Sequence, residues 1–275
     1  RWINLGIIKI QPSELMKICI IFALARYFHD LNDKEIQLKD LITPSIMLII
    51  PAILIIKQPD LGTGLILLML GGIMFFIAGV GKWIFITGFT AIGLTLPVAW
   101  HFLYDYQKNR ILTFLNPELD PLGGGYNIIQ SKIAIGSGGL TGKGFIQGSQ
   151  SQLQFLPERQ TDFIFTMLSE EWGLLGGSLV LLVFSILIFY CYIIALNTRS
   201  KFARLLVIGV ASMFFLHMFI NIAMVMGLLP AVGVPLPLLS YGGTMMITIL
   251  IGFGLVISAH IHNRQNINSA LKNFC

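Results

Sequence analysis

Charge is scarce in this chain. Asp, Glu, Lys and Arg make up 11% of the 275 residues, against about 25% in a typical soluble domain. Hydrophobic residues make up 55%, and the mean hydropathy is +0.81. This composition excludes an ordinary soluble globular protein. It predicts an all-α polytopic membrane protein, because a helix satisfies its own backbone hydrogen bonds in lipid.

Cysteine and histidine are also few. The three cysteines, Cys19, Cys191 and Cys275, show neither disulfide nor metal spacing, and the five histidines are scattered. A metal site built on these residues is therefore not expected. The net charge of +5 comes from bases spread over loops, which is an ordinary topology signal and argues against a nucleic-acid partner. The sequence requires no cofactor, and it leaves a divalent cation, Mg or Mn, open.

Apolar segments divide the chain into stretches of about 20 residues, the length that crosses a bilayer. We predict seven spans in a single integral membrane domain over residues 1–275, at 13–29, 41–57, 64–80, 83–103, 173–195, 203–229 and 241–261. Lys and Arg in the short loops place the end of the first span in the cytoplasm. Residues 104–172 then form a long extracytoplasmic loop between the fourth and fifth spans, which we expect to be ordered and to hold short helices.

The start of the chain is polar. Residue 1 is Arg rather than Met, and no signal peptide is present. We interpret this start as the sign of a missing N-terminal part.

One short stretch concentrates charge at a membrane boundary. Residues 155–173 read FLPERQTDFIFTMLSEEWG. Their charged side chains are Glu158, Arg159, Asp162, Glu170 and Glu171. A charged side chain at a membrane boundary is costly unless it is paired or takes part in function, so the stretch is a candidate functional site. Thr161 is expected to cap a helix here. Asp162 is then either a first-turn acid that favours the helix dipole or a general base.

Two further polar motifs open helices. In QPSELMK, at residues 11–17, Glu14 and Lys17 are three apart, so they face the same side and can pair. Lys17 then either snorkels to the interface or binds an anion inside a cavity. In QPDLGTG, at residues 58–64, Asp60 is expected to cap the following helix.

Two segments rich in glycine and proline carry the remaining candidates. AIGSGGLTGKG, at residues 134–144, fails the phosphate-loop pattern, because Ser137 and Gly144 stand where Gly and Ser or Thr are required. Its backbone amides either hold a phosphate or belong to a flexible turn. LPAVGVPLPLLSYGG, at residues 229–243, interrupts the helical pattern at membrane depth and either lines a cavity or forms a plain loop. Five outer-loop bases, Lys143 and Arg159 among them, either hold a diphosphate or balance nearby acids.

Together these motifs resemble the SEDS family (shape, elongation, division and sporulation), and its RodA branch most closely. The matching stretches follow the family's order along nearly the whole chain. They are RWINLG at 1–6, QPSELMK at 11–17, QPDLGTG at 58–64, NPELDPLGGGYNIIQSKIAIGSGGLTGKG at 116–144, FLPERQTDFIFTMLSEEWGLLGG at 155–177 and GLLPAVGVPLPLLSYGG at 227–243. The resemblance implies a fold of about ten spans, of which the first three are expected to be missing here.

The resemblance implies a peptidoglycan glycosyltransferase of the bacterial inner (cytoplasmic) membrane. Such an enzyme polymerises lipid II during cell elongation and rod-shape maintenance, with its active site on the extracytoplasmic face. Asp162 falls on the family's essential aspartate, and Glu14 and Lys17 fall on its polar pair. We also assign a wider set to substrate binding: Asp60, Lys143, Arg159 and Ser240. The implied partners are lipid II, inner-membrane lipids and a class B penicillin-binding protein.

Two other functions stay open. A lipid II flippase would use the same lipid without bond chemistry, and it should tolerate Asp162→Asn. A non-catalytic scaffold would only recruit the penicillin-binding protein. The acidic cluster is confined to the outer face, which favours the enzyme, because a transport path needs polar groups at both ends.

Overall fold

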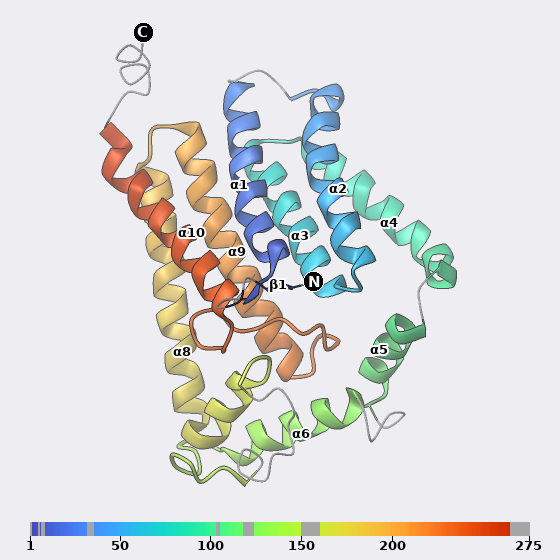
Figure 1. Cartoon of the computed structure of the whole chain (residues 1–275), viewed down its shortest axis with the longest axis vertical. Helices are drawn as coiled ribbons and strands as arrows, with labels where there is room; N and C mark the ends of the chain where they lie inside the picture. The colour runs from blue at the N-terminus through green and yellow to red at the C-terminus, as the bar shows by residue number, and fades with distance from the viewer. Residues whose placement is uncertain are drawn as a thin grey trace. The chain divides into compact units, whose positions relative to one another are not determined.

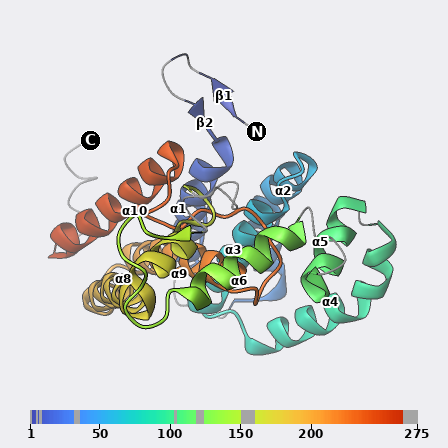
Figure 2. The same ribbon diagram turned by 90° about the horizontal axis from the view of Figure 1, so that it is seen from below.

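The computed structural model describes residues 2–4, 6, 9–31, 36–102, 105–117, 124–149 and 160–264. This part of the chain is mostly helical, as Figure 1 shows. Its helices are α1 (Pro12–Asp30), α2 (Ile42–Lys57), α3 (Leu61–Ala78), α4 (Lys82–Phe102), α5 (Asp105–Leu115), α6 (Gly124–Ser137), α8 (Ile164–Asn197), α9 (Lys201–Val225) and α10 (Gly243–Ile261), with 3-10 turns η1 (Leu38–Leu41) and η3 (His262–Arg264). A hairpin of two short strands, β1 (Ile3–Asn4) and β2 (Lys9–Ile10), precedes α1 (Figure 2).

The chain divides into two compact units, which are described separately. Unit 1 comprises Arg1–Val80, Ile186–Phe215 and Gly243–Cys275. Unit 2 comprises Gly81–Ser185 and Leu216–Gly242. The single membrane domain over residues 1–275 stays a prediction.

In unit 1, α1 packs against α2, α3 and α10, and α2 packs against α3 (Figure 1). Small residues allow the helices to approach closely, as in other membrane bundles. Gly71 of α3 lies against Leu48 of α2, and Gly209 of α9 lies against Ile21 and Met74. The most deeply buried side chains of this core include Ile21, Leu24, Phe28, Leu67, Leu70 and Met74.

In unit 2, the described part of the predicted long loop contains short helices. Helices α5 and α6 fall inside residues 104–172 and contact each other, which confirms the expectation of short helices there. Ser131 of α6 fixes that helix to its neighbours. Its hydroxyl lies 2.7 Å from the Thr166 hydroxyl of α8, and it donates to the Val225 carbonyl at the end of α9 (2.7 Å).

Five helices of the described part are long and apolar enough to cross a membrane. They are Leu38–Lys57, Leu61–Ala78, Ile164–Asn197, Lys201–Val225 and Gly243–Ile261. These correspond to five of the seven predicted spans. The other two predictions fall on α1 and α4, and the count of seven stays a prediction. Most residues of the apolar stretch in α8 are not buried within the protein, as expected for a helix that faces lipid.

The structure corrects two boundaries. The fifth span does not begin at residue 173, because α8 already begins at Ile164 and is only interrupted at Gly173 (φ 64°, ψ −159°). The sixth ends at Val225 rather than at residue 229, since Gly227 takes a left-handed conformation (φ 71°) that stops the helix. Thr161 is therefore not an N-cap: it lies in a turn with Asp162 and Phe163, before the first helical residue.

Candidate functional site

The turn that carries Asp162 lies at the start of α8 in unit 2, and the Asp162 side chain is partly buried there. The non-helical segment 226–242 follows α9 and runs back to this turn. Two contacts near Ser240 join them: the Tyr241 amide donates to the Gln160 carbonyl (2.8 Å), and the Ser240 hydroxyl donates to the Thr161 carbonyl (2.5 Å). The proline-rich segment therefore supports the turn and is not a free loop.

Asn221 of α9 provides a third attachment. Its side chain is fully buried, and its Nδ2 donates to the carbonyls of Asp162 (2.8 Å) and Val234 (2.7 Å). Only the NH₂ end of an amide can donate to two carbonyls, so these partners determine the orientation of the side chain. Sequence reasoning did not assign Asn221 to the site. Its position in a span, just before the proline-rich segment, was the available signal.

Ser240 is buried, and its hydroxyl already has protein partners. It donates to the Thr161 carbonyl and accepts from the Leu236 amide (2.7 Å). Its assignment to substrate binding stays a prediction, but the geometry gives it a clear structural task. Gly233 (φ 69°) belongs to the same proline-rich segment, and a Cβ there would lie 3.4 Å from Asp162 Oδ2. The backbone at Gly233 therefore comes close to the carboxylate.

Lys143 pairs with a buried acid. Its Nζ lies 2.8 Å from Oε1 of Glu170, whose side chain is 1% exposed, and 3.0 Å from the Ser149 hydroxyl. The assignment of Lys143 to a lipid diphosphate stays a prediction. Arg159, also assigned to substrate binding, lies outside the described residues.

An apolar pocket of about 320 Å³ lies beside the first part of α8. Residues from α6, α8 and α9 line it, among them Phe165, Gly173 and Ile222, and the polar residues are Ser169 and Ser178. Such a lining suits a hydrocarbon chain better than a sugar.

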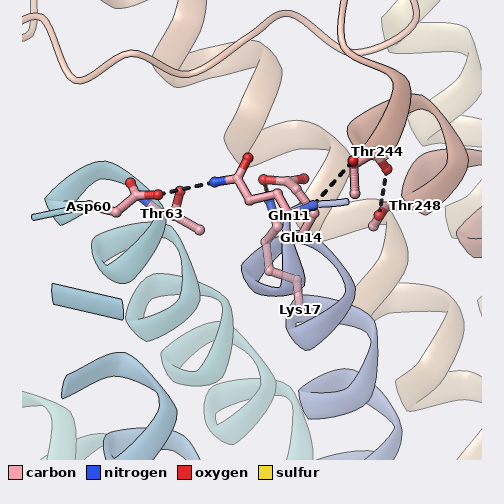
Figure 3. Close-up of polar contacts among 7 residues, drawn as sticks. All are labelled: Gln11, Glu14, Lys17, Asp60, Thr63, Thr244 and Thr248. Carbon is pink, nitrogen blue, oxygen red and sulfur yellow. Dashed lines mark hydrogen bonds and ion pairs between the residues drawn. The ribbon is translucent and has the colours of Figure 1, made fainter. Parts of the chain in front are cut away.

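Unit 1 holds a second polar cluster, at the N-terminal ends of α1, α3 and α10 (Figure 3). Glu14 Oε1 and Lys17 Nζ form an ion pair of 2.7 Å, which confirms the predicted pairing. Lys17 is fully buried within the protein, so the alternative in which it snorkels to the interface is wrong. Helices packed around α1 close over the ammonium group, which a single-helix view cannot show.

Asp60 links two elements of this cluster. Its Oδ1 accepts from the Thr63 amide (3.2 Å), which confirms the predicted cap of α3, and its Oδ2 accepts from Gln11 Nε2 (3.1 Å). The Gln11 amide in turn donates to the Thr244 hydroxyl at the start of α10 (3.3 Å). Thr248 donates to the Thr244 carbonyl (2.9 Å), as Figure 3 shows. Sequence reasoning missed Gln11 and Thr244, because their partners lie far away along the chain.

The family model of the FtsW, RodA and SpoVE cell cycle proteins matches residues 1–265. The chain belongs to this family. Peptidoglycan glycosyltransferase MrdB of Escherichia coli (strain K12) is 43% identical over 274 residues, which cover 96% of this chain and 72% of MrdB. Stage V sporulation protein E of Bacillus subtilis (strain 168) is 38% identical over 271 residues, with the same coverage of both chains.

Solved structures agree with this membership. A chain from a peptidoglycan synthase complex that coordinates polymerization and crosslinking is 31% identical, with a TM-score of 0.81 over 96% of this chain and 74% of that chain. The crystal structure of the rod shape determining protein RodA of Thermus thermophilus is 27% identical, with a TM-score of 0.68 over 96% of this chain and 70% of that one. The predicted all-α polytopic fold and the resemblance to this family are thus confirmed.

Within the described residues, His, Cys, Asp and Glu do not gather in groups of three that could hold a metal ion. Mg²⁺ is commonly bound by one or two carboxylates together with substrate phosphates. A cation at Asp162 would accordingly need the oxygens of a bound diphosphate, and the predicted Mg or Mn stays a prediction.

Proposed function

We propose that this family member is a peptidoglycan glycosyltransferase that polymerises lipid II during cell elongation and rod-shape maintenance. The names of its relatives support this activity at 33–43% identity over most of the chain. The observation that carries the proposal is the attachment of the Asp162 turn. Three side chains or backbone groups outside the turn hold its carbonyls at residues 160, 161 and 162, so the carboxylate stands on a preorganised backbone.

In this mechanism Asp162 is the general base. It accepts the proton of the acceptor GlcNAc 4-hydroxyl as that oxygen attacks the anomeric carbon of the donor sugar. The bond from this carbon to the lipid diphosphate breaks, and the configuration inverts. One carboxylate suffices, because diphosphate leaves without protonation, in contrast to the paired carboxylates of most glycosidases. General base catalysis typically contributes 10²–10⁴-fold.

The remaining assignments concern the lipid substrate. In unit 1 we assign Glu14, Lys17 and Asp60 to substrate binding, and in unit 2 we assign Lys143, Arg159 and Ser240. The bases in each set suit the diphosphate of the lipid. The apolar pocket beside α8 suits part of the polyprenyl chain. The inner membrane, an extracytoplasmic active site and a class B penicillin-binding protein as partner belong to the same proposal. The relation of this chain to a solved peptidoglycan synthase complex supports the partner.

The test measures glycan strands made from purified lipid II by the chain in lipid nanodiscs. Asp162→Asn should lower the rate by at least 100-fold, because the amide cannot accept the proton. Asp105→Asn is the matched control: this aspartate is exposed in the first turn of α5, and its variant should keep the wild-type rate.

Three results would overturn the proposal. A wild-type rate of polymerisation by the Asp162→Asn variant would show that Asp162 is not the general base. Lipid II translocation without glycan formation by the wild-type protein would identify a flippase. A protein that neither polymerises nor translocates lipid II, yet binds a class B penicillin-binding protein, would be the scaffold.

A further inference from the structure

The helix that follows Asp162 is broken. At Gly173 the backbone leaves the helical region (φ 64°, ψ −159°), so residues 164–172 form a short helical segment separate from residues 174–197. A break of this kind leaves carbonyl groups at the end of one segment and amide groups at the start of the next without helical partners. In apolar surroundings each unsatisfied group is costly, so other parts of the protein must bind them.

Residues 138–144, which we name the glycine clasp, satisfy both sides of this break. Four backbone hydrogen bonds join the clasp to α8, two in each direction. They run from Leu174 N to Gly139 O (2.9 Å), from Leu175 N to Leu140 O (3.1 Å), from Lys143 N to Glu170 O (3.1 Å) and from Gly144 N to Glu171 O (3.0 Å). The amides of Lys143 and Gly144 are therefore engaged by α8, which argues against the earlier alternative of a phosphate-binding loop.

Glycine is required where the clasp touches the break. A Cβ on Gly142 would overlap the Glu171 carbonyl, and one on Gly138 would overlap the Ser169 carbonyl. A Cβ on Gly173 would meet the Gly142 amide and would lie 2.6 Å from the Leu140 carbonyl. All of these neighbours are backbone atoms that cannot rotate away. Gly142 also has a positive φ (81°), which a residue with a side chain adopts only with strain.

An ion pair also joins the glycine clasp to α8. Lys143 Nζ lies 2.8 Å from Oε1 of Glu170, and the Glu170 side chain is almost fully buried. Lys143 thus joins the clasp to α8 through both its backbone amide and its side chain. Removal of the lysine alone would leave a buried carboxylate without its cation, which is much worse than removal of both charges.

The segment 164–172 connects the clasp to the proposed general base. Its first residue lies two positions after Asp162, and Asn221 holds the Asp162 carbonyl at that end. Ser131 binds Thr166 in between, and the clasp binds Glu170 and Glu171 at the other end. A short helix held at both ends transmits a displacement at one end to the other. We propose that the glycine clasp is a positioning element for the reaction, which fixes the segment that presents Asp162; this inference rests on the proposed function.

Two variants in nanodiscs test the clasp, both in the full chain. Gly142→Ala places a Cβ against the Glu171 carbonyl. Gly88→Ala is the matched control in the same unit, because Gly88 is exposed in α4 and a Cβ there meets nothing within 4 Å. Gly142→Ala should lower kcat for lipid II polymerisation at least tenfold and leave KM within about twofold, and Gly88→Ala should match the wild-type protein.

A second pair of variants tests the clasp even if Gly142→Ala fails to fold. Lys143→Met should lower kcat, and the double variant Lys143→Met with Glu170→Gln should recover most of kcat, because the buried charge is gone. KM for lipid II should stay raised in both variants, because both lack the lysine that we assign to substrate binding. A merely structural role of Lys143 would change the yield and melting temperature without this kcat-specific loss and rescue. Equal kcat in the wild-type and Lys143→Met proteins would overturn the proposal.

Geometry is measured independently of activity. Spin labels at the exposed positions Gln160 and Leu182, in a background without native cysteines, report the distance across the break. Gly142→Ala should shift or broaden this distance distribution, and Gly88→Ala should not. An unchanged distribution overturns the clasp whether or not the wild-type protein polymerises lipid II. Absence of polymerisation by the wild-type protein, with the distance shift present, would instead overturn the proposed function and leave the geometric part of the inference standing.

Discussion

Asn221→Asp tests how the Asp162 turn is held. The substitution keeps the size of the side chain and replaces its NH₂ group by an oxygen. Nδ2 donates to the carbonyls of Asp162 (2.8 Å) and Val234 (2.7 Å). A carboxylate oxygen in its place would face two carbonyl oxygens in a fully buried position. Both hydrogen bonds are then lost, and like partial charges repel each other.

The magnitude follows from these two contacts. Each hydrogen bond contributes about 0.5–1.5 kcal/mol net, and an unsatisfied buried group costs about 1–3 kcal/mol. We therefore expect a loss of roughly 2–4 kcal/mol in the free energy of unfolding. At about 2–4 °C per kcal/mol for a chain of this size, the melting temperature should fall by roughly 5–15 °C. Because a displacement of about 1 Å can cost 100-fold in rate, kcat should fall by about 10- to 100-fold.

The assay is the melting temperature of the purified protein in nanodiscs, followed by the rate of lipid II polymerisation below that temperature. Asn109→Asp is the control, since Asn109 is exposed in α5. A melting temperature and a kcat within error of the wild-type values for Asn221→Asp would refute the reasoning. Such a result would mean that the two bonds of Asn221 do not determine where Asp162 lies.

Two further predictions concern unit 1. Glu14→Gln or Lys17→Met alone should destabilise the protein by about 3–5 kcal/mol, because each leaves one buried charge without its partner. The double variant should regain most of this loss in a double-mutant cycle of melting temperatures, and strict additivity would contradict the prediction. Asp60→Ala should cost about 1–2 kcal/mol through the lost cap of α3 and the lost bond to Gln11. Asp60→Asn, which keeps an acceptor for the Thr63 amide, should retain about half of that stability in the same assay, and equal losses would count against the cap.

Local features of unit 1 were predictable because their partners are near in sequence. Asp60 caps α3 through the amide of Thr63, three residues on, and Glu14 pairs with Lys17 at the same spacing. Helix geometry alone brings such residues together. The burial of Lys17 was not predictable, since it depends on the helices that surround α1.

The contacts that hold the Asp162 turn in unit 2 join residues far apart in the sequence. Asn221 and Asp162 are 59 residues apart, and Ser240 reaches the Thr161 carbonyl over 79 residues. Both bonds end on backbone carbonyls, which carry no sequence signal. The break at Gly173 was hidden for a related reason: glycine is tolerated inside membrane helices, so its identity does not show whether the helix continues through it.

The sequence by itself determined the membrane class, the family, the approximate spans and the carboxylate that we propose as the base, because hydropathy and motif order are properties of the chain alone. Tertiary structure decided what holds that carboxylate in place: an amide in a neighbouring helix, a serine in a proline-rich segment, and a glycine-rich stretch joined to a broken helix. The physical reason is that a buried backbone group in an apolar environment must find a partner, and only the folded arrangement of distant segments determines which partner is within reach.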